Sequence, residues 1–127
     1  LIKKFVDAEK NNIDIVEVWG DGSATREFLH VDDLADAAVF LMNNYEDQEF
    51  LNIGSDYEIS IKELAELIKE LTNYKGNIKW LTDMPNGTPK RVMDNSKLFG
   101  LGWKPKIDFV IGLYETIKWY KEQYEKN

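Results

Sequence analysis

Apolar residues recur every three or four positions in several stretches of the chain, a spacing that places them on one face of a helix. Leu34, Ala37, Ala38 and Leu41 follow it closely. The pattern predicts helices over residues 1–11, 32–44 and 61–71, a short helix that ends near residue 101, and a last helix that begins after Asp108.

Short runs of β-branched and other apolar residues lie between these stretches and are typical of strands. They predict strands over residues 13–19, 26–29, 50–53 and 77–81. The Gly-Asp-Gly-Ser sequence at 20–23 predicts a turn, because Gly adopts positive φ without steric cost and Asp and Ser bond to nearby backbone. Strands alternating with helices predict a mixed α/β unit, one domain over residues 1–127, with too few strands for a self-sufficient doubly wound sheet.

Two helix starts carry capping signals. Ser60 and Glu63 match the S-x-x-E capping box, which predicts a helix start at that point. Asp32 or Asp33 is expected to cap the helix over 32–44 or to place a favourable negative charge at its N-terminus. His30 precedes them as the only histidine. A metal site from these three residues, or a general-base role for His30, is a weaker hypothesis than a histidine held by packing and a backbone hydrogen bond.

The composition narrows the classes of partner. A net charge of −7 argues against nucleic acid, because affinity for its backbone comes from Lys and Arg on phosphates. The longest apolar run, residues 37–42, is too short to span a bilayer, so no membrane partner is expected. The absence of cysteine excludes disulfides and Cys-based metal sites, and fits a cytoplasmic location.

In an acidic chain an anionic ligand needs cations placed locally, and arginine is rare here. Arg26 and Arg91 are the two arginines. Arg26 could hold a diphosphate by two parallel hydrogen bonds, and Trp19 across the glycine turn offers a flat face to a ribose or hexose ring. The alternative is that both arginines form structural ion pairs. The turn itself lacks both phosphate-loop spacings.

Residues 83–91, DMPNGTPKR, form a second candidate segment. Two prolines bracket Asn86-Gly87 and make the loop stiff, and Pro89 is followed at once by Lys90 and Arg91. A stiff loop that ends in two cations loses little entropy when it orders around an anion. The alternative is an ordinary surface turn.

Three segments carry a resemblance to a known family: WGDGSATREFLHVDDLADA, LNIGSDYEISIKELAELI and DMPNGTPKRVMDNSKLFGLGWKPKI. In order and spacing the chain resembles the carboxy-terminal part of the extended short-chain dehydrogenase/reductases, the NAD-dependent epimerase/dehydratase family. The REFLHVDD run and the PNGTPK loop are most similar to the branch that epimerises and reduces GDP-4-keto-6-deoxy-D-mannose with NADPH.

The resemblance implies that this region binds the GDP-sugar substrate. Trp19 and Arg26 match substrate-contacting positions of that branch. Lys4, which periodicity alone places on a solvated surface, matches a basic substrate contact. Asn86 stands where some members carry Asp, so its contact would become a neutral hydrogen bond. Lys90 and Arg91 match the basic end of the same loop.

The family's cofactor fingerprint and its Tyr-x-x-x-Lys pair with the accompanying Ser do not occur in this sequence. The branch's catalytic Cys and His are also missing; His30 does not match that His, and Tyr120-Lys121 has the wrong spacing. Leu1 lies inside an amphipathic pattern, so we expect a longer protein. The resemblance then implies that a missing amino-terminal Rossmann domain binds NADP(H), and that the intact enzyme is a homodimer formed through that half.

On this interpretation the 127-residue chain carries no catalytic residue, binds no cofactor or metal, and is inactive alone. Cut free, it should expose apolar surface and self-associate. Two alternatives stay open: another nucleotide-sugar epimerase or dehydratase that uses UDP- or dTDP-sugars, and a non-catalytic binding or interaction module.

Overall fold

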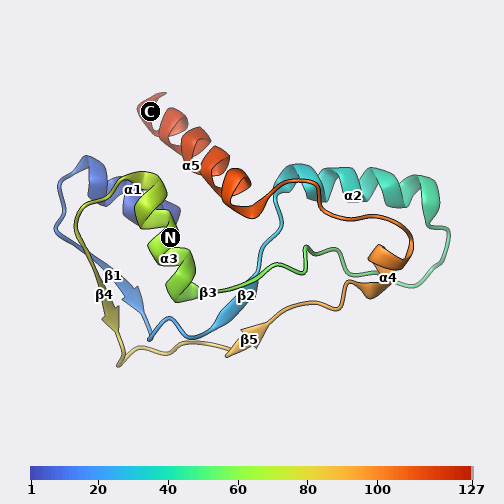
Figure 1. The fold of residues 1–127 in the computed structure, drawn as a ribbon, viewed down its shortest axis with the longest axis horizontal. Coiled ribbons are helices and arrows are strands. Elements are labelled where there is room, and N and C mark those ends of the chain that lie inside the picture. Colours follow the sequence, from blue (N-terminus) through green and yellow to red (C-terminus); the bar gives the residue numbers. More distant parts are fainter. Residues whose placement is uncertain (127) are drawn as a thin grey trace.

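The structure, a computed structural model, describes residues 1–126 (Figure 1). Helices and strands alternate through much of the chain, which confirms the mixed α/β class. The elements are α1 (Ile2–Lys10), β1 (Ile15–Trp19), β2 (Thr25–Glu27), α2 (Val31–Asn44), β3 (Glu58–Ser60), α3 (Ile61–Thr72), β4 (Asn77–Leu81), β5 (Lys90–Arg91), α4 (Ser96–Gly100) and α5 (Phe109–Lys126).

The strands form two small sheets. β1 and β4 pair in parallel, with Trp19 opposite Leu81 at the end of the ladder. β2 is the middle strand of the second sheet, antiparallel to β3 and parallel to β5. The ladder between β2 and β5 has two register pairs, Thr25 with Lys90 and Arg26 with Arg91. The predicted strands at 13–19 and 77–81 are confirmed, although β1 starts at Ile15.

The larger hydrophobic core lies between the first sheet and the helices α1, α3 and α5. Val16 and Val18 of β1 are buried, whereas Ile13 and Ile15 are about half exposed, so the inward face begins later than the alternation suggested. A T-shaped contact joins the Phe5 and Tyr74 rings. This core holds β1 in place, and the predicted site begins where β1 ends.

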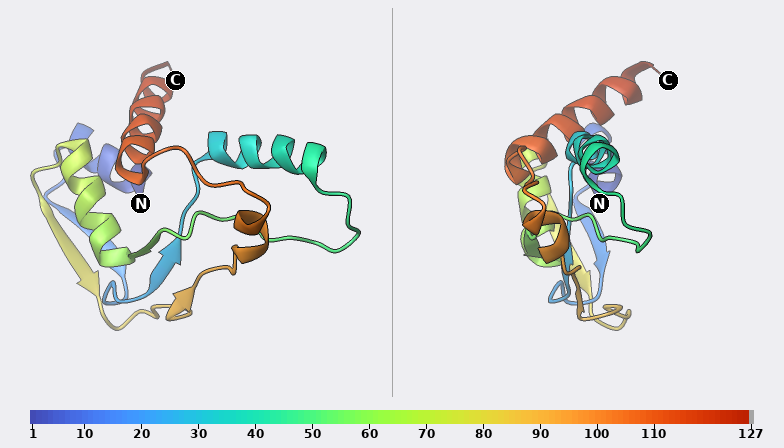
Figure 2. Two further views of the ribbon diagram at one scale, coloured as in Figure 1. Left: turned by 45° about the vertical axis from the view of Figure 1, so that its right-hand side comes forward. Right: turned by 90° about the vertical axis from the view of Figure 1, so that its right-hand side faces the viewer.

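A second, smaller core joins α2 to α4. Ala37, Leu98 and Trp103 form its buried centre. The Trp103 indole nitrogen donates a hydrogen bond to an Asp36 carboxylate oxygen at 2.8 Å. Figures 1 and 2 show α2 and α4 on the opposite side of the three-stranded sheet from α1 and α3. That sheet therefore connects the two cores.

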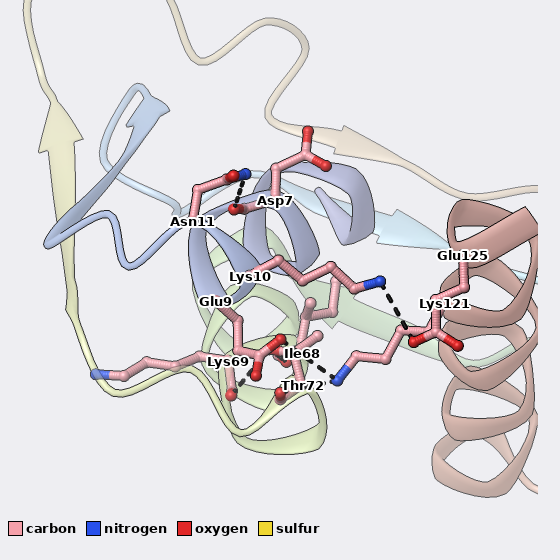
Figure 3. A network of polar contacts seen from close by, with 9 residues as sticks. All are labelled: Asp7, Glu9, Lys10, Asn11, Ile68, Lys69, Thr72, Lys121 and Glu125. Atoms are coloured by element: carbon pink, nitrogen blue, oxygen red, sulfur yellow. Dashed lines mark hydrogen bonds and ion pairs between the residues drawn. The ribbon is translucent and has the colours of Figure 1, made fainter. Parts of the chain in front are cut away.

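Polar contacts tie the carboxy-terminal half of α5 to α1 and α3 (Figure 3). The Lys121 ammonium donates to the Thr72 carbonyl at 3.1 Å and lies 4.0 Å from a Glu9 carboxylate oxygen. Lys10 pairs with Glu125 at 3.5 Å. None of the helices within residues 1–126 is long and apolar enough to cross a membrane.

The capping box is present as predicted. The Ser60 hydroxyl accepts from the Glu63 N–H, and the Glu63 carboxylate accepts from the Ser60 N–H, both at 3.1 Å. Ile59 and Leu64, on either side of the helix start, are both buried in the larger core. α3 ends at Asn73, whose φ of 63° is left-handed. Local sequence was sufficient to define this helix.

Neither Asp32 nor Asp33 caps α2, but both lie in its first turn, where the other predicted alternative, a negative charge at the helix start, is confirmed. His30 Nδ1 accepts a hydrogen bond from the Asp32 N–H at 3.1 Å, so the imidazole takes the N-cap position. Asp33 is 3% exposed and accepts from the N–H groups of Lys106 and Ile107 at 3.0–3.2 Å. Its carboxylate therefore anchors the segment that leads into α5.

The strand predicted over 50–53 does not form. Phe50 is 94% exposed, and within the described residues no strand lies beside this segment to pair with it. Apolar composition favours an extended chain, but a strand also requires a partner for its backbone groups. β3 and β5, which no sequence signal indicated, exist because each pairs with β2.

Candidate functional site

β1 delivers Trp19 to the start of the glycine turn. The indole is 58% exposed. Gly20 and Gly22 have φ values of 81° and 78°, which confirms the predicted turn and its need for glycine. The Asp21 carboxylate accepts from the Ser23 N–H at 2.9 Å, and hydrogen bonding from Ser23 lowers the Asp21 pKa. The turn is thus fixed by its own side chains.

Asn86 connects the 82–89 loop to this turn. Its amide oxygen accepts a hydrogen bond from the Asp21 N–H at 2.8 Å. The amide also occupies the space that a side chain at Gly20 would fill. Loop and turn therefore meet at one edge of the molecule, next to Trp19, and Asn86 is the residue that joins them.

Arg26 lies on β2, half-buried, beneath the same loop. Its Nη1 group donates to the carbonyl of Thr25 at 2.6 Å and to that of Thr88 at 2.7 Å. A guanidinium carries five N–H donors, so Nε and Nη2 keep donors that no described residue uses. Both acceptors are neutral carbonyls, which hold the guanidinium in place without neutralising its charge.

The other predicted cations lie on neighbouring elements. Lys4 of α1 donates to the Glu17 carbonyl at 2.9 Å, two residues before Trp19. Lys90 pairs with a Glu58 carboxylate oxygen at 3.0 Å, and the Thr25 hydroxyl together with Lys90 lowers the Glu58 pKa. Arg91, the register partner of Arg26, is exposed, and its side chain has no hydrogen-bond or ion-pair partner between residues 1 and 126.

The structure therefore brings Trp19, Arg26, Asn86 and the two residues of β5 to one edge, and Lys4 of α1 is bonded to the strand β1 that leads to it. The alternative that both arginines form structural ion pairs is not realised in the described part of the chain. Lys90 alone among the four predicted cations has a carboxylate partner there. Sequence spacing suggested this edge, but the Arg26–Thr88 contact spans 62 positions and had no local signal.

A cavity of about 760 Å³ lies elsewhere, between α1, α3, α5 and the segments that follow β2 and precede β3. Its lining is mostly apolar and includes Phe28, Trp119 and the stacked pair Tyr57–Phe109, with ring centroids 4.3 Å apart. It contains none of Trp19, Arg26, Asn86, Lys90 or Arg91. Sequence reasoning missed it because its walls come from segments far apart in the chain.

His30 also lines this cavity, with its ring packed against Gly112 of α5. Nδ1 is occupied by the cap of α2. The preferred sequence interpretation, a histidine held by packing and a backbone hydrogen bond, is confirmed. Residues 1–126 contain no cluster of three or more His, Cys, Asp or Glu side chains that could hold a metal.

The glycine turn does not fit a dinucleotide. A side chain at Gly22 would meet the Trp80 ring and Lys62, and one at Gly20 would meet Asn86. Both glycines thus face this chain's own side chains and leave no cradle for a pyrophosphate. The turn also leads into β2, whereas a dinucleotide fingerprint opens a helix.

Comparison with known proteins agrees with the fold and with the sequence resemblance. Residues 1–54 match the model of the NAD dependent epimerase/dehydratase family. Relatives that are named as GDP-L-fucose synthases align with 94–96% of the chain at 51–56% identity. The chain belongs to the NAD-dependent epimerase/dehydratase family.

Several of its relatives within that family are GDP-L-fucose synthases. It is 56% identical to putative GDP-L-fucose synthase 2 of Arabidopsis thaliana over 96% of the chain, and 51% identical to GDP-L-fucose synthase 1 of that plant over 94%. The crystal structure of a GDP-L-fucose synthetase from Naegleria fowleri bound to NADP superposes with a TM-score of 0.91, at 30% identity over 98% of this chain. The chain spans 37% of the length of the two plant relatives and 39% of the solved structure.

Proposed function

We propose that this chain is the substrate-binding part of a GDP-L-fucose synthase, the NADPH-dependent enzyme that epimerises and reduces GDP-4-keto-6-deoxy-D-mannose. The observation that carries the proposal is Arg26, a guanidinium oriented by two carbonyls and without a carboxylate partner within residues 1–126. The loop that accepts its hydrogen bond is joined through Asn86 to the turn that follows the exposed Trp19. The relatives' names give the substrate class.

The geometry suits a nucleotide diphosphate. The unused donors of Arg26 can bond two phosphate oxygens in parallel, and Arg91 adds a second positive charge one strand away. Trp19 can cover a sugar or ribose ring with its exposed face. In a chain with a net charge of −7, these cations determine where an anion can bind.

The remaining predicted contacts have supporting roles in this proposal. Asn86 holds the loop against the turn and offers a neutral amide to the ligand. Lys4 and Lys90 flank the edge, Lys4 through its bond to β1 and Lys90 through its pair with Glu58. Binding at this edge would position the keto-sugar for a reaction carried out by groups outside this chain.

NADP(H) and the proton- and hydride-transferring residues belong, on this proposal, to an amino-terminal Rossmann domain of the longer protein. The apolar cavity and the exposed apolar residues of α2, such as Val31 at 69% and Met42 at 83%, are the surfaces that this domain would cover. The intact enzyme would then be a homodimer, and the 127-residue chain would consume no NADPH on its own.

Calorimetric titration of the longer protein with GDP and GDP-mannose tests the site. Arg26→Ala should weaken binding by about 1.5–3 kcal/mol, the range for hydrogen bonds to charged groups. Arg26→Lys should recover only part of this, because a Lys lacks the planar fork. Lys97→Ala, which removes an exposed cation from α4, is the matched control. Unchanged affinity in both Arg26→Ala and Trp19→Ala would refute the proposal.

The same titration distinguishes the base. GDP should bind more tightly than UDP or dTDP, because a pocket that bonds one base's edges rejects a base that leaves them unpaired. Equal affinities for the three would favour another nucleotide-sugar enzyme. Oxidation of NADPH by the isolated chain with authentic substrate would show that the chemistry lies here after all.

A further inference from the structure

Glu27, next to Arg26 on β2, is the centre of a partly buried polar cluster that the proposed function does not use. One carboxylate oxygen accepts from the Ser55 N–H at 3.0 Å and from the Asn95 side-chain amide at 3.1 Å. The other oxygen accepts from the Met93 N–H at 3.3 Å. One side chain thus bonds to three residues in two separate segments of the chain, Ser55 in one and Met93 and Asn95 in the other.

The residues around this carboxylate pack closely against it. Gly54 is buried, and a side chain there would collide with the Glu27 carboxylate and the Asn95 amide. Asn95 is 1% exposed and donates also to Asp56 at 2.8 Å. The Glu27 carboxylate is therefore enclosed by groups that depend on its position.

The bond to Met93 matters because β5 is weakly held. Its ladder with β2 has only two register pairs, and the next position along β2 is Glu27. The Glu27 side chain takes up the Met93 N–H just beyond the end of the ladder. Loss of this bond would free the strand that keeps Arg91 beside Arg26.

We propose that Glu27 is a positioning residue, which fixes β5 against β2 and thereby holds Arg91 and the end of the 82–89 loop in place for the anionic part of the ligand. The inference rests on the proposed function, since it assigns Glu27 an effect on the same site. Successive side chains of a strand point to opposite faces, so Glu27 acts from behind the Arg26 face.

Glu27→Gln provides a test because electrostatics and positioning predict opposite changes in the affinity for an anion. Electrostatics alone predicts tighter binding of an anion, because a negative charge next to Arg26 is removed. Positioning predicts weaker binding. A Gln at this position has one acceptor oxygen, and if that oxygen accepts from Ser55 and Asn95, its NH₂ group faces the Met93 N–H. Two donors then face one another and the hydrogen bond to Met93 is lost. Asp94→Asn is the matched control: it removes one negative charge from the segment that contains Met93, and an Asn at this position keeps an acceptor oxygen for the Ser96 N–H.

In the longer protein, GDP should bind Glu27→Gln about tenfold more weakly, the effect of losing one hydrogen bond to a charged group. Asp94→Asn should bind it as the unmodified protein does. Amide hydrogen exchange should accelerate at residues 90–93 in Glu27→Gln alone. Equal or tighter binding by Glu27→Gln would overturn the inference. If that variant does not fold, Glu27→Asp decides with the charge retained: weaker binding supports the inference, and unchanged binding or a failure to fold overturns it.

Arg26→Ala keeps this test separate from that of the proposed function. If neither Arg26→Ala nor Trp19→Ala weakens GDP binding, the site itself is wrong. If Arg26→Ala weakens binding and Glu27→Gln does not, the site stands and Glu27 is only part of the scaffold.

Discussion

Substitution of Asp33 tests the most distinctive contact of the α2 start. Adjacent aspartates look equivalent in the sequence, but Asp33 is buried while the Asp32 side chain is 78% exposed. Asp33 accepts from the N–H groups of Lys106 and Ile107, which lie just before α5. Asp33→Ala should release that segment, whereas Asp32→Ala removes only a charge at the helix start.

The expected costs follow from these contacts. Hydrogen bonds to a charged acceptor contribute about 1.5–3 kcal/mol each. Because Lys106 is exposed and water can reach its N–H, the total for Asp33→Ala should be about 2–4 kcal/mol. A charge at a helix N-terminus is worth about 0.3–1 kcal/mol, which is the whole expected cost of Asp32→Ala. The cost of Asp33→Asn should lie between those of Asp33→Ala and Asp32→Ala, because the Asn amide keeps one acceptor oxygen.

Urea denaturation followed by circular dichroism measures these free energies of unfolding, with the slope checked for two-state behaviour. For a chain of 127 residues, 1 kcal/mol corresponds to roughly 4 °C in Tm, so Asp33→Ala should melt about 8–16 °C lower. If Asp33→Ala and Asp32→Ala unfold within about 0.5 kcal/mol of one another, an error typical of such comparisons, the anchoring role is refuted.

Two further predictions concern the turn and the capping box. Gly20→Ala should destabilise by about 1–2 kcal/mol in thermal unfolding, because its φ of 81° is left-handed and the Asn86 amide fills the space for a methyl group; an unchanged Tm would contradict this. Ser60→Ala should cost about 1 kcal/mol as the loss of an N-cap. Hydrogen bonding from Ser60 lowers the Glu63 pKa below its usual 4.5, so the stability contributed by the Glu63 carboxylate is complete above that pH and is lost as the pH falls through the lowered value. Glu63→Gln should therefore reduce the slope of the unfolding free energy against pH between about pH 5 and pH 3, the range in which carboxylates titrate. A slope equal to that of the unmodified protein would contradict this.

The parts of the fold that sequence predicted are those with local causes. α3 needed only its capping box and its apolar spacing, and both lie within the helix or at its edge. β1 and β4 were predicted because each contains a run of alternating apolar residues, Val16 and Val18 in β1 and Ile78 and Trp80 in β4. The 50–53 segment has the same composition and forms no strand, because a strand depends on a partner that composition does not specify.

In the candidate site too, the sequence identified residues with local signals but not the long-range contacts that place them. Trp19, Arg26 and Asn86 stand out locally, as an aromatic, a rare arginine and a polar residue beside glycine turns. The contacts that give them their places are long-range: Arg26 bonds to Thr88, and Asn86 bonds to Asp21. Buried Asp33 was missed for the same reason, since its partners lie more than seventy positions later in the chain.

The pattern of ion pairing separates a binding edge from an ordinary surface. Several cations elsewhere in this acidic chain meet carboxylates, as Lys79 does with Glu17 and Lys106 does with Asp36. Arg26 instead bonds to carbonyls within residues 1–126. Carbonyl acceptors fix a guanidinium but leave its full charge for another anion, whereas a carboxylate would neutralise it. Since a structural arginine gains more from a carboxylate than from a carbonyl, this arrangement favours recognition of an external anion over a purely structural role.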